Sequence, residues 1–154
     1  MSTRSPVAGT AAPVAHRPAS PTGTLRLGTA LVLGGAVAEY GVTTLHPASE
    51  APDHHSAVFA EYAASDAWIA VHLGQFAAGL VLLAGVLVLL RGLRAAGAAA
   101  LLVRVGEAAA IVTGAVFAVL QAVDGVALKQ AVDSLAAAPG ELRAAAFHDA
   151  EIVR

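Results

Sequence analysis

The sequence has no cysteine, few charged residues and few aromatic residues. Without cysteine the chain has no disulfides, no thiolate metal ligands and no cysteine nucleophile. Charged residues occupy 13% of the 154 positions, against roughly 25% in soluble domains. The formal net charge of −2 provides no basic surface for nucleic acid. These absences argue against a soluble enzyme domain and against a nucleic-acid partner.

Hydrophobic residues dominate instead, at 57% of the chain, and they form long runs. Three runs, 25–45, 68–90 and 98–123, are each about as long as the roughly 20 residues that a helix needs to cross a bilayer. We therefore predict an all-α protein, a transmembrane helical bundle with three spans. Its membrane-embedded helical domain is expected to cover 25–154.

The segments before and after the first span are polar. Residues 1–24 hold four of the seven prolines and no apolar period, which predicts a disordered tail. Residues 46–67 form a polar loop, in which Ser56 is predicted to cap a short helix. Phe59 and Tyr62 of that helix are expected to lie against the membrane surface.

Two further features mark the later spans. Trp68 opens the second span and is expected to anchor it at the membrane interface. The segment 124–154 is amphipathic, and Pro139 with Gly140 divides it into two short helices. Two interpretations stay open for this segment: an amphipathic end to a three-span protein, or a truncated fourth helix of a four-helix bundle.

The distribution of arginines predicts the orientation. The loop 46–67 contains no lysine or arginine. The tail, the start of the first span and the turn after the second span carry Arg4, Arg17, Arg26, Arg91, Arg94 and Arg104. By the positive-inside rule the N-terminus is cytoplasmic and the loop lies outside, in a cell inner membrane. The alternative is a signal peptide cleaved before Glu39, since Ala36 and Ala38 match the small residues of a cleavage site.

Small residues recur at every fourth position of all three spans. Such stripes predict close helix packing, because lipid provides no hydrophobic drive and small side chains let two backbones approach. The alternative explanation is that alanine and glycine are simply abundant in this chain. The stripes are Ala30, Gly34 and Ala38; Ala70, Gly74 and Ala78; and Gly106, Ala110, Gly114, Ala118 and Ala122.

Polar side chains occur near the outer end of each span. At 1.5 Å per residue, Glu39 and Gln75 are expected about 10 Å inside the outer boundary and His72 about 6 Å inside it. Ionisable groups in lipid are costly, so each needs a partner or a function. The predicted outer-leaflet polar cluster consists of Glu39, His46, His72, Gln75, Gln121 and Asp124.

Two interpretations of this cluster compete. In the structural one, Glu39 is protonated or paired with His72, and the glutamines hydrogen-bond between helices. In the functional one, the cluster is a cavity that opens outward and binds a proton, a cation or a small polar ligand. The first interpretation is the simpler, because nothing in the sequence completes a known site.

Arg104 and Glu107 interrupt the third span, which therefore starts at 98 or at 105. Their spacing of three residues predicts a local ion pair on one helix.

Metal and cofactor sites have weak sequence support. His54 and His55 are the candidate metal ligands of the loop, but adjacent histidines lack the i, i+4 spacing of a helical metal site, so no metal is expected. A haem or quinone beside His72 is a further alternative, although no second histidine lies well inside a span. No bound cofactor is therefore expected.

A glutamate late in the first span (GGAVAEYG), the polar loop and an Arg-x-x-Glu opening the third span (RVGEAAA) form a recognisable layout. This layout, over about 25–130, resembles uncharacterised small multi-pass bacterial membrane proteins of the domain-of-unknown-function type. The resemblance implies a helical bundle in a bacterial inner membrane and no particular activity.

From the sequence we expect an integral membrane protein of unassigned, non-enzymatic role, an accessory subunit that packs with lipid and with itself or another chain. A proton- or ion-linked transporter component using Glu39 and His72 is the first alternative. A haem- or quinone-binding membrane redox protein is the second.

Overall fold

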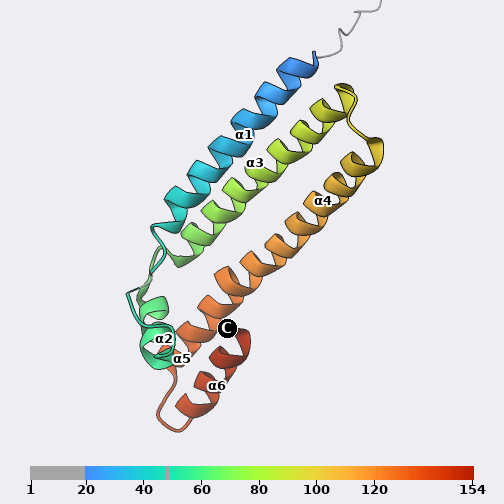
Figure 1. Ribbon diagram of the computed structural model, residues 1–154. Helices are drawn as coiled ribbons and strands as arrows, with labels where there is room; N and C mark the ends of the chain where they lie inside the picture. Colours follow the sequence, from blue (N-terminus) through green and yellow to red (C-terminus); the bar gives the residue numbers. More distant parts are fainter. Residues whose placement is uncertain (1–19, 48) are drawn as a thin grey trace, which may run out of the picture.

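The structure of the protein is a computed structural model that describes residues 20–47 and 49–154, and these are helical apart from short connections (Figure 1). Most of the predicted disordered tail lies outside the described residues. Three helices are long and apolar enough to cross a membrane, as predicted. In chain order the elements are α1 (Pro21–Thr43), α2 (His55–Ala64), α3 (Trp68–Ala95), α4 (Ala100–Ala122), the π-helix η1 (Val123–Leu128), α5 (Lys129–Ala137) and α6 (Arg143–Val153).

The first helix begins earlier than the apolar run. Ser20 is its N-cap, and the Ser20 hydroxyl accepts a hydrogen bond from the Gly23 N–H at 3.2 Å. Pro21 follows as the first helical residue, where its fixed φ suits the helix and its missing N–H is not needed. The last residues assigned to the tail are therefore the first turn of α1.

The helix α3 lies between α1 and α4 and packs against both, and each neighbouring pair is antiparallel (Figure 1). The α1–α3 contact is much the more extensive. Glycines make it possible: a Cβ on Gly35 would lie 2.6 Å from the Leu82 backbone nitrogen, and one on Gly85 would lie 2.6 Å from the Val32 nitrogen. The two backbones therefore touch where neither residue carries a side chain.

The small-residue stripes are only partly used. Ala30, Gly34 and Ala38 are exposed on α1, and an added Cβ on Gly34 would have no neighbour within 4 Å, so the predicted packing stripe of the first span is wrong. The stripe on α4 does face α3, with Gly106 against Leu90 and Ala110 buried.

Large apolar side chains cover the outside of the three long helices. Leu33, Leu73 and Val116 are 60%, 60% and 64% exposed, and many other leucines and valines are similar. A continuous apolar exterior of this kind is unfavourable in water and favourable in hydrocarbon. The exterior therefore agrees with the composition in indicating a membrane environment.

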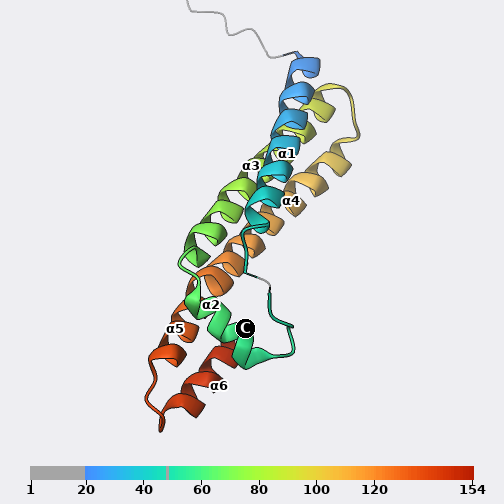
Figure 2. The same cartoon turned by 90° about the vertical axis from the view of Figure 1, so that its left-hand side faces the viewer.

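Beyond one end of the long helices, α2, α5 and α6 gather into a small helical cap (Figure 2). The chain passes from α4 through η1 into α5, and Pro139 and Gly140 separate α5 from α6 as predicted. The buried core of the cap consists of Phe59, Trp68, Leu128, Val132, Leu135 and Ala150. This core is distinct from the glycine-rich packing of the long helices.

The cap overturns three local predictions. Phe59 and Trp68 are each only 1% exposed, so neither side chain is a membrane-surface anchor. They are buried because α5 and α6 fold back over them. The helix α2 begins at His55 with His54 at its N-cap, and no side chain caps it, so the predicted Ser56 cap is wrong.

At the opposite end, the predicted Arg104–Glu107 ion pair is also wrong. Glu107 instead accepts a hydrogen bond from Arg94, with Nη2 and Oε2 2.7 Å apart. The pair joins α3 to α4 because the turn between them brings the end of one helix beside the start of the other.

Candidate metal centre

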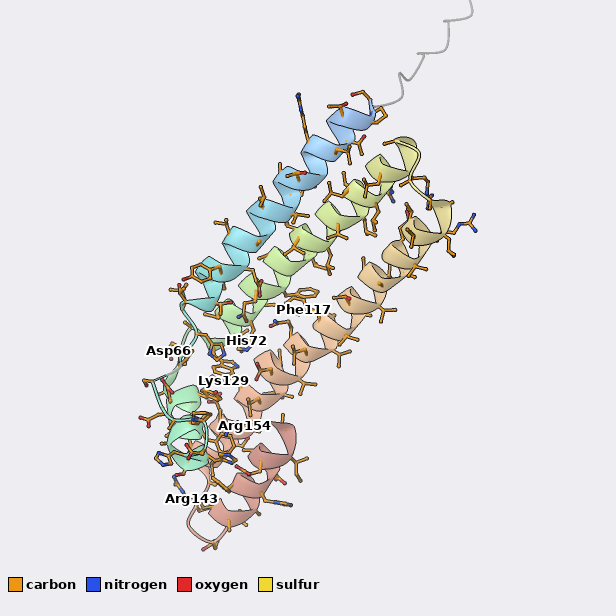
Figure 3. The ribbon with its side chains drawn as sticks, in the orientation of Figure 1. Asp66, His72, Phe117, Lys129, Arg143 and Arg154 are labelled. Carbon is orange, nitrogen blue, oxygen red and sulfur yellow. The ribbon has the colours of Figure 1, made fainter. Side chains whose placement is uncertain are left out.

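His46, His72 and Asp124 meet where α1 ends, α3 begins and α4 passes into η1. One ligand atom from each residue lies within 4.8 Å of those of the other two. His72 is marked in Figure 3 between the long helices and the cap. The three residues thus come from three separate elements and form one group.

His72 is the most buried member of the group, at 4% exposure. It lies one helical turn after Trp68, and its Nδ1–H donates to the Trp68 carbonyl oxygen at 2.8 Å. Its Nε2 lies 3.1 Å from Oδ2 of Asp124. This nitrogen therefore either donates a proton to the carboxylate or, once deprotonated, shares a cation with it.

His46 is placed by a tight turn that follows α1. The backbone N–H of Leu45 donates to the Val42 carbonyl, and that of His46 donates to the Thr43 carbonyl, both at 3.0 Å. The ring Nδ1–H donates to the Pro47 carbonyl oxygen at 2.8 Å. This bond leaves Nε2 of His46 with a free lone pair.

Asp124 belongs to η1, where the helix widens to i→i+5 hydrogen bonding. Such π-bulges are rare in proteins overall, but those that occur are often found at functional sites. The following residue, Gly125, packs on His72, and a Cβ there would lie 2.6 Å from the His72 Cβ. The backbone carbonyl of Asp124 accepts a hydrogen bond from Trp68 Nε1 at 3.1 Å. The Asp124 side chain is 42% exposed.

Aromatic rings pack against the imidazoles of His46 and His72. The centroid of the Trp68 ring lies 4.7 Å from that of His46 and 4.6 Å from that of His72. Tyr62 also packs on this tryptophan, with centroids 4.2 Å apart, and its ring lies 6.1 Å from that of His46. Burial raises the pKa of the Tyr62 phenol, so this side chain stays neutral. The ring packing restricts the rotation of both histidines.

The loop after His46 is anchored by Glu61 of α2. The Glu61 carboxylate accepts hydrogen bonds from the Ser49 hydroxyl and, at 2.9 Å, from the Ser49 N–H. These hydrogen bonds lower the pKa of Glu61. The anchor ties the His46 turn to the cap.

The donor set suits a divalent first-row transition-metal ion. Ligand atoms held about 2.1 Å from one tetrahedral zinc ion lie about 3.4 Å apart, so a spacing of up to 4.8 Å needs only a modest side-chain movement. The partly exposed Asp124 can supply that movement. Metal-binding histidines usually donate their second ring N–H to a carbonyl or carboxylate, and both His46 and His72 do so.

The other members of the predicted polar cluster lie elsewhere. Gln75 donates from Nε2 to the Thr43 hydroxyl at 3.0 Å, which joins α3 to α1. Gln121 lines a cavity beside His72. Glu39 lies in a groove with Phe117, and its buried Oε2 has no partner among the described residues.

The predicted pairing of Glu39 with His72 is therefore wrong. His72 hydrogen-bonds to Asp124, which comes to it from η1. A comparable predicted depth does not bring two side chains together when they point from different faces of their helices.

The loop candidates His54 and His55 are not part of this group. His54 is the N-cap residue of α2, and the ring Nδ1 of His55 pairs with the Glu151 carboxylate of α6 within the cap. Arg154 reinforces that closure by donating to the Pro52 carbonyl oxygen at 2.8 Å. The contact with Glu151 therefore gives His55 a structural role in the cap.

The sequence contained all three ligand candidates within its polar cluster but did not indicate a metal site. His72 and Asp124 are 52 positions apart, and no short motif joins them to His46. The signal that the sequence did offer is that all three residues lie near the outer ends of the predicted spans. This position indicates how deep each residue lies but not the direction in which its side chain points.

No family model matches the chain, and no curated protein or solved structure matches it either. The function is therefore inferred from the geometry of the site.

Proposed function

We propose that the protein is an integral membrane protein that binds a divalent first-row transition-metal ion through His46, His72 and Asp124. The observation that carries this proposal is the orientation of the two imidazoles. Each donates its Nδ1–H to a backbone carbonyl, at 2.8 Å, and so reserves its Nε2 for a ligand. The Asp124 carboxylate lies 3.1 Å from His72 Nε2, and one of its oxygens lies within 4.8 Å of a ring nitrogen of His46.

The charge and number of the donors fit this type of ion. Two neutral imidazoles and one carboxylate contribute a single negative charge, which leaves a bound divalent ion with a net positive charge. Three protein ligands also leave at least one coordination position for water or an anionic ligand. Imidazole and carboxylate ligands suit zinc, cobalt, nickel and ferrous iron, whereas magnesium and calcium favour oxygen ligands alone.

We also propose that the site lies at the outer surface of an inner membrane. The loop 46–67 has no lysine or arginine, while the connection between α3 and α4 is flanked by Arg91, Arg94 and Arg104. Because the chain has no cysteine, single cysteines report topology cleanly. In intact cells a membrane-impermeant maleimide should label Asp53→Cys but not Ala98→Cys, and the reverse pattern would invert the orientation.

Cobalt binding tests the metal proposal. The purified protein in nanodiscs should bind one Co²⁺ per chain with the visible absorption bands of a low-symmetry, four- or five-coordinate ion. His46→Gln and Asp124→Asn should each weaken binding by at least tenfold, since each removes one of three ligands. His54→Gln is the matched control, because that histidine lies outside the group.

The outcomes separate the proposal from a structural role. If Co²⁺ does not bind saturably, or binds equally to the wild type and Asp124→Asn, the contact of His72 with Asp124 is only a hydrogen bond between α3 and η1. Circular dichroism and Trp68 fluorescence establish that each variant keeps its fold.

A further inference from the structure

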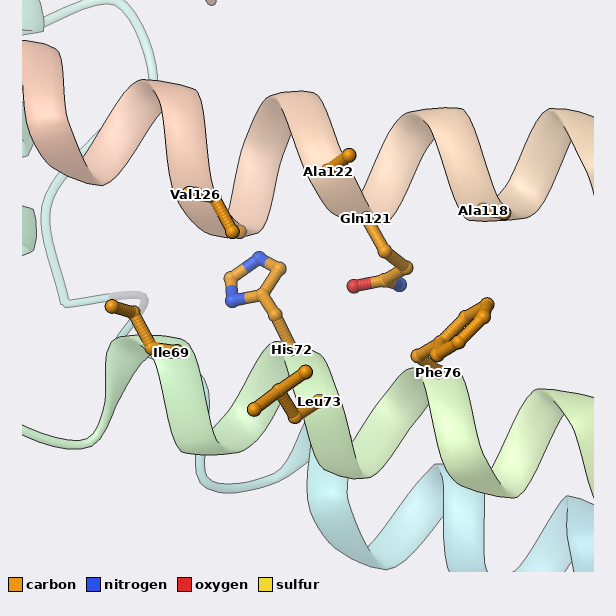
Figure 4. Close-up of a pocket in the computed structure, with 9 residues that line it drawn as sticks. Ile69, His72, Leu73, Phe76, Ala118, Gln121, Ala122 and Val126 are labelled. Carbon is orange, nitrogen blue, oxygen red and sulfur yellow. The ribbon is translucent and has the colours of Figure 1, made fainter.

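A cavity of about 210 Å³ lies between α3 and the junction of α4 with η1. Figure 4 shows His72 reaching into this space from α3 and Gln121 reaching into it from α4, with Phe76 beside Gln121. The remainder of the lining is apolar, and Ala118 forms part of the α4 wall. The cavity adjoins the candidate metal ligands through His72 but is not enclosed by them.

One polar atom in the cavity wall has no protein partner. The Gln121 Oε1 atom is buried, and none of the described residues donates a hydrogen bond to it. Buried amide oxygens are normally paired, because leaving one unsatisfied inside an apolar environment is costly. A hydroxyl or N–H donor bound in the cavity would therefore satisfy Gln121 Oε1.

The cavity opens on the apolar exterior of the long helices. Ile69, Leu73 and Val126 form part of its lining and are themselves 45%, 60% and 42% exposed on the apolar exterior. A molecule that reaches the cavity by this route must dissolve in hydrocarbon. A molecule that binds there should thus be mainly apolar and carry a single polar group.

We propose that this cavity binds a membrane-dissolved aromatic alcohol of the phenol or quinol class. A dry cavity of about 150 Å³ accommodates benzene, so a cavity of about 210 Å³ accommodates one substituted ring. The ring lies beside Phe76, where aromatic pairs are favourable. The hydroxyl donates to Gln121 Oε1, and the proposal is independent of metal binding.

Fluorine NMR with 4-fluorophenol tests this assignment, using the full chain in nanodiscs and protein-free nanodiscs as the blank. The matched probe 4-fluoroanisole has the same ring but no hydroxyl donor. We expect 4-fluorophenol to bind at least about tenfold more tightly than 4-fluoroanisole, because only the phenol satisfies the buried oxygen. Equal affinities, or no binding above the blank, would overturn the proposal.

Variants locate the bound probe. Gln121→Leu should reduce 4-fluorophenol affinity to that of 4-fluoroanisole, and Ala118→Phe should block both probes by filling the cavity. The exposed Gln130→Leu is the control and should change neither affinity. Unchanged phenol binding in Gln121→Leu would overturn the assignment.

Two further measurements complete the design. Competition by a decyl-substituted hydroquinone that exceeds competition by hydroquinone would identify a lipid-borne quinol, whereas the reverse order would identify a free phenol. Cobalt binding on the same samples separates the two proposals. If phenol binding fails while Co²⁺ still binds, only the cavity assignment is lost.

Discussion

Two adjacent glycines of α1 should respond in opposite ways to the same substitution. A Cβ on Gly35 would lie 2.6 Å from the Leu82 backbone nitrogen, which cannot move without shifting α3. A Cβ on Gly34 would have no neighbour within 4 Å. Alanine at Gly34 should therefore be tolerated or stabilising, whereas alanine at Gly35 should separate α1 from α3.

The magnitude follows from two terms. Alanine gains up to about 1 kcal/mol of helix propensity over glycine at either position, so this term cancels between the two variants. Overpacking of a close contact costs about 1–3 kcal/mol. The free energy of unfolding of Gly35→Ala should therefore be about 1–3 kcal/mol below that of Gly34→Ala.

Unfolding in mixed micelles with increasing SDS, followed by fluorescence, measures this difference. Trp68 is the single tryptophan and its ring lies 4.7 Å from that of His46 at the end of α1, so its emission reports separation of α1 from α3. Equal stabilities for the two variants would refute the packing argument. A loss of stability in Gly34→Ala alone would show that the exposed stripe of α1 is the packed one.

Three further predictions concern single contacts. Trp68→Phe removes the indole hydrogen bond to the Asp124 carbonyl. Because loss of a contact that supports a metal ligand typically costs about 10–100-fold in affinity, this variant should bind Co²⁺ about 10–100-fold more weakly, as measured by visible absorbance. Arg94→Ala should lower the free energy of unfolding by about 0.2–1 kcal/mol, the range of an exposed ion pair, and Arg104→Ala should not remove that pair. Because the folded-state pKa of Glu61 is lowered, its loop anchor should be intact above pH 4.5 and be lost as the pH falls through that lowered pKa. Carboxyl NMR titration follows the Glu61 step directly, and Glu61→Gln should abolish the acid-dependent change in the loop. An anchor that instead weakens on raising the pH from 4.5 to 7 would contradict the assignment.

The three long apolar helices were predictable because their signal is local. About 20 consecutive apolar residues identify a spanning helix whatever lies next to it, and all three runs became long helices. The break at Pro139 and Gly140 was predictable for the same reason, since both residues act on their own backbone.

The candidate site was only partly predictable. Spacing and rise placed His46, His72 and Asp124 near the outer ends of the predicted spans, with His72 about 6 Å further in, but they did not give the direction in which each side chain points. The π-helix, whose hydrogen bonds span one residue more than those of an α-helix, places Asp124 opposite His72. No sequence pattern predicted this π-helix. Glu39, at a similar predicted depth, points into a different groove.

The sequence by itself determined that this is a helical protein with three long apolar helices, because helix formation and hydrophobicity are properties of each segment. Only the tertiary structure decided which glycines touch, that Phe59 and Trp68 are buried beneath the cap, and which histidines share a carboxylate. The physical reason is that helices in lipid associate through shape and a few polar contacts, without a hydrophobic drive that would mark the contacting face in the sequence.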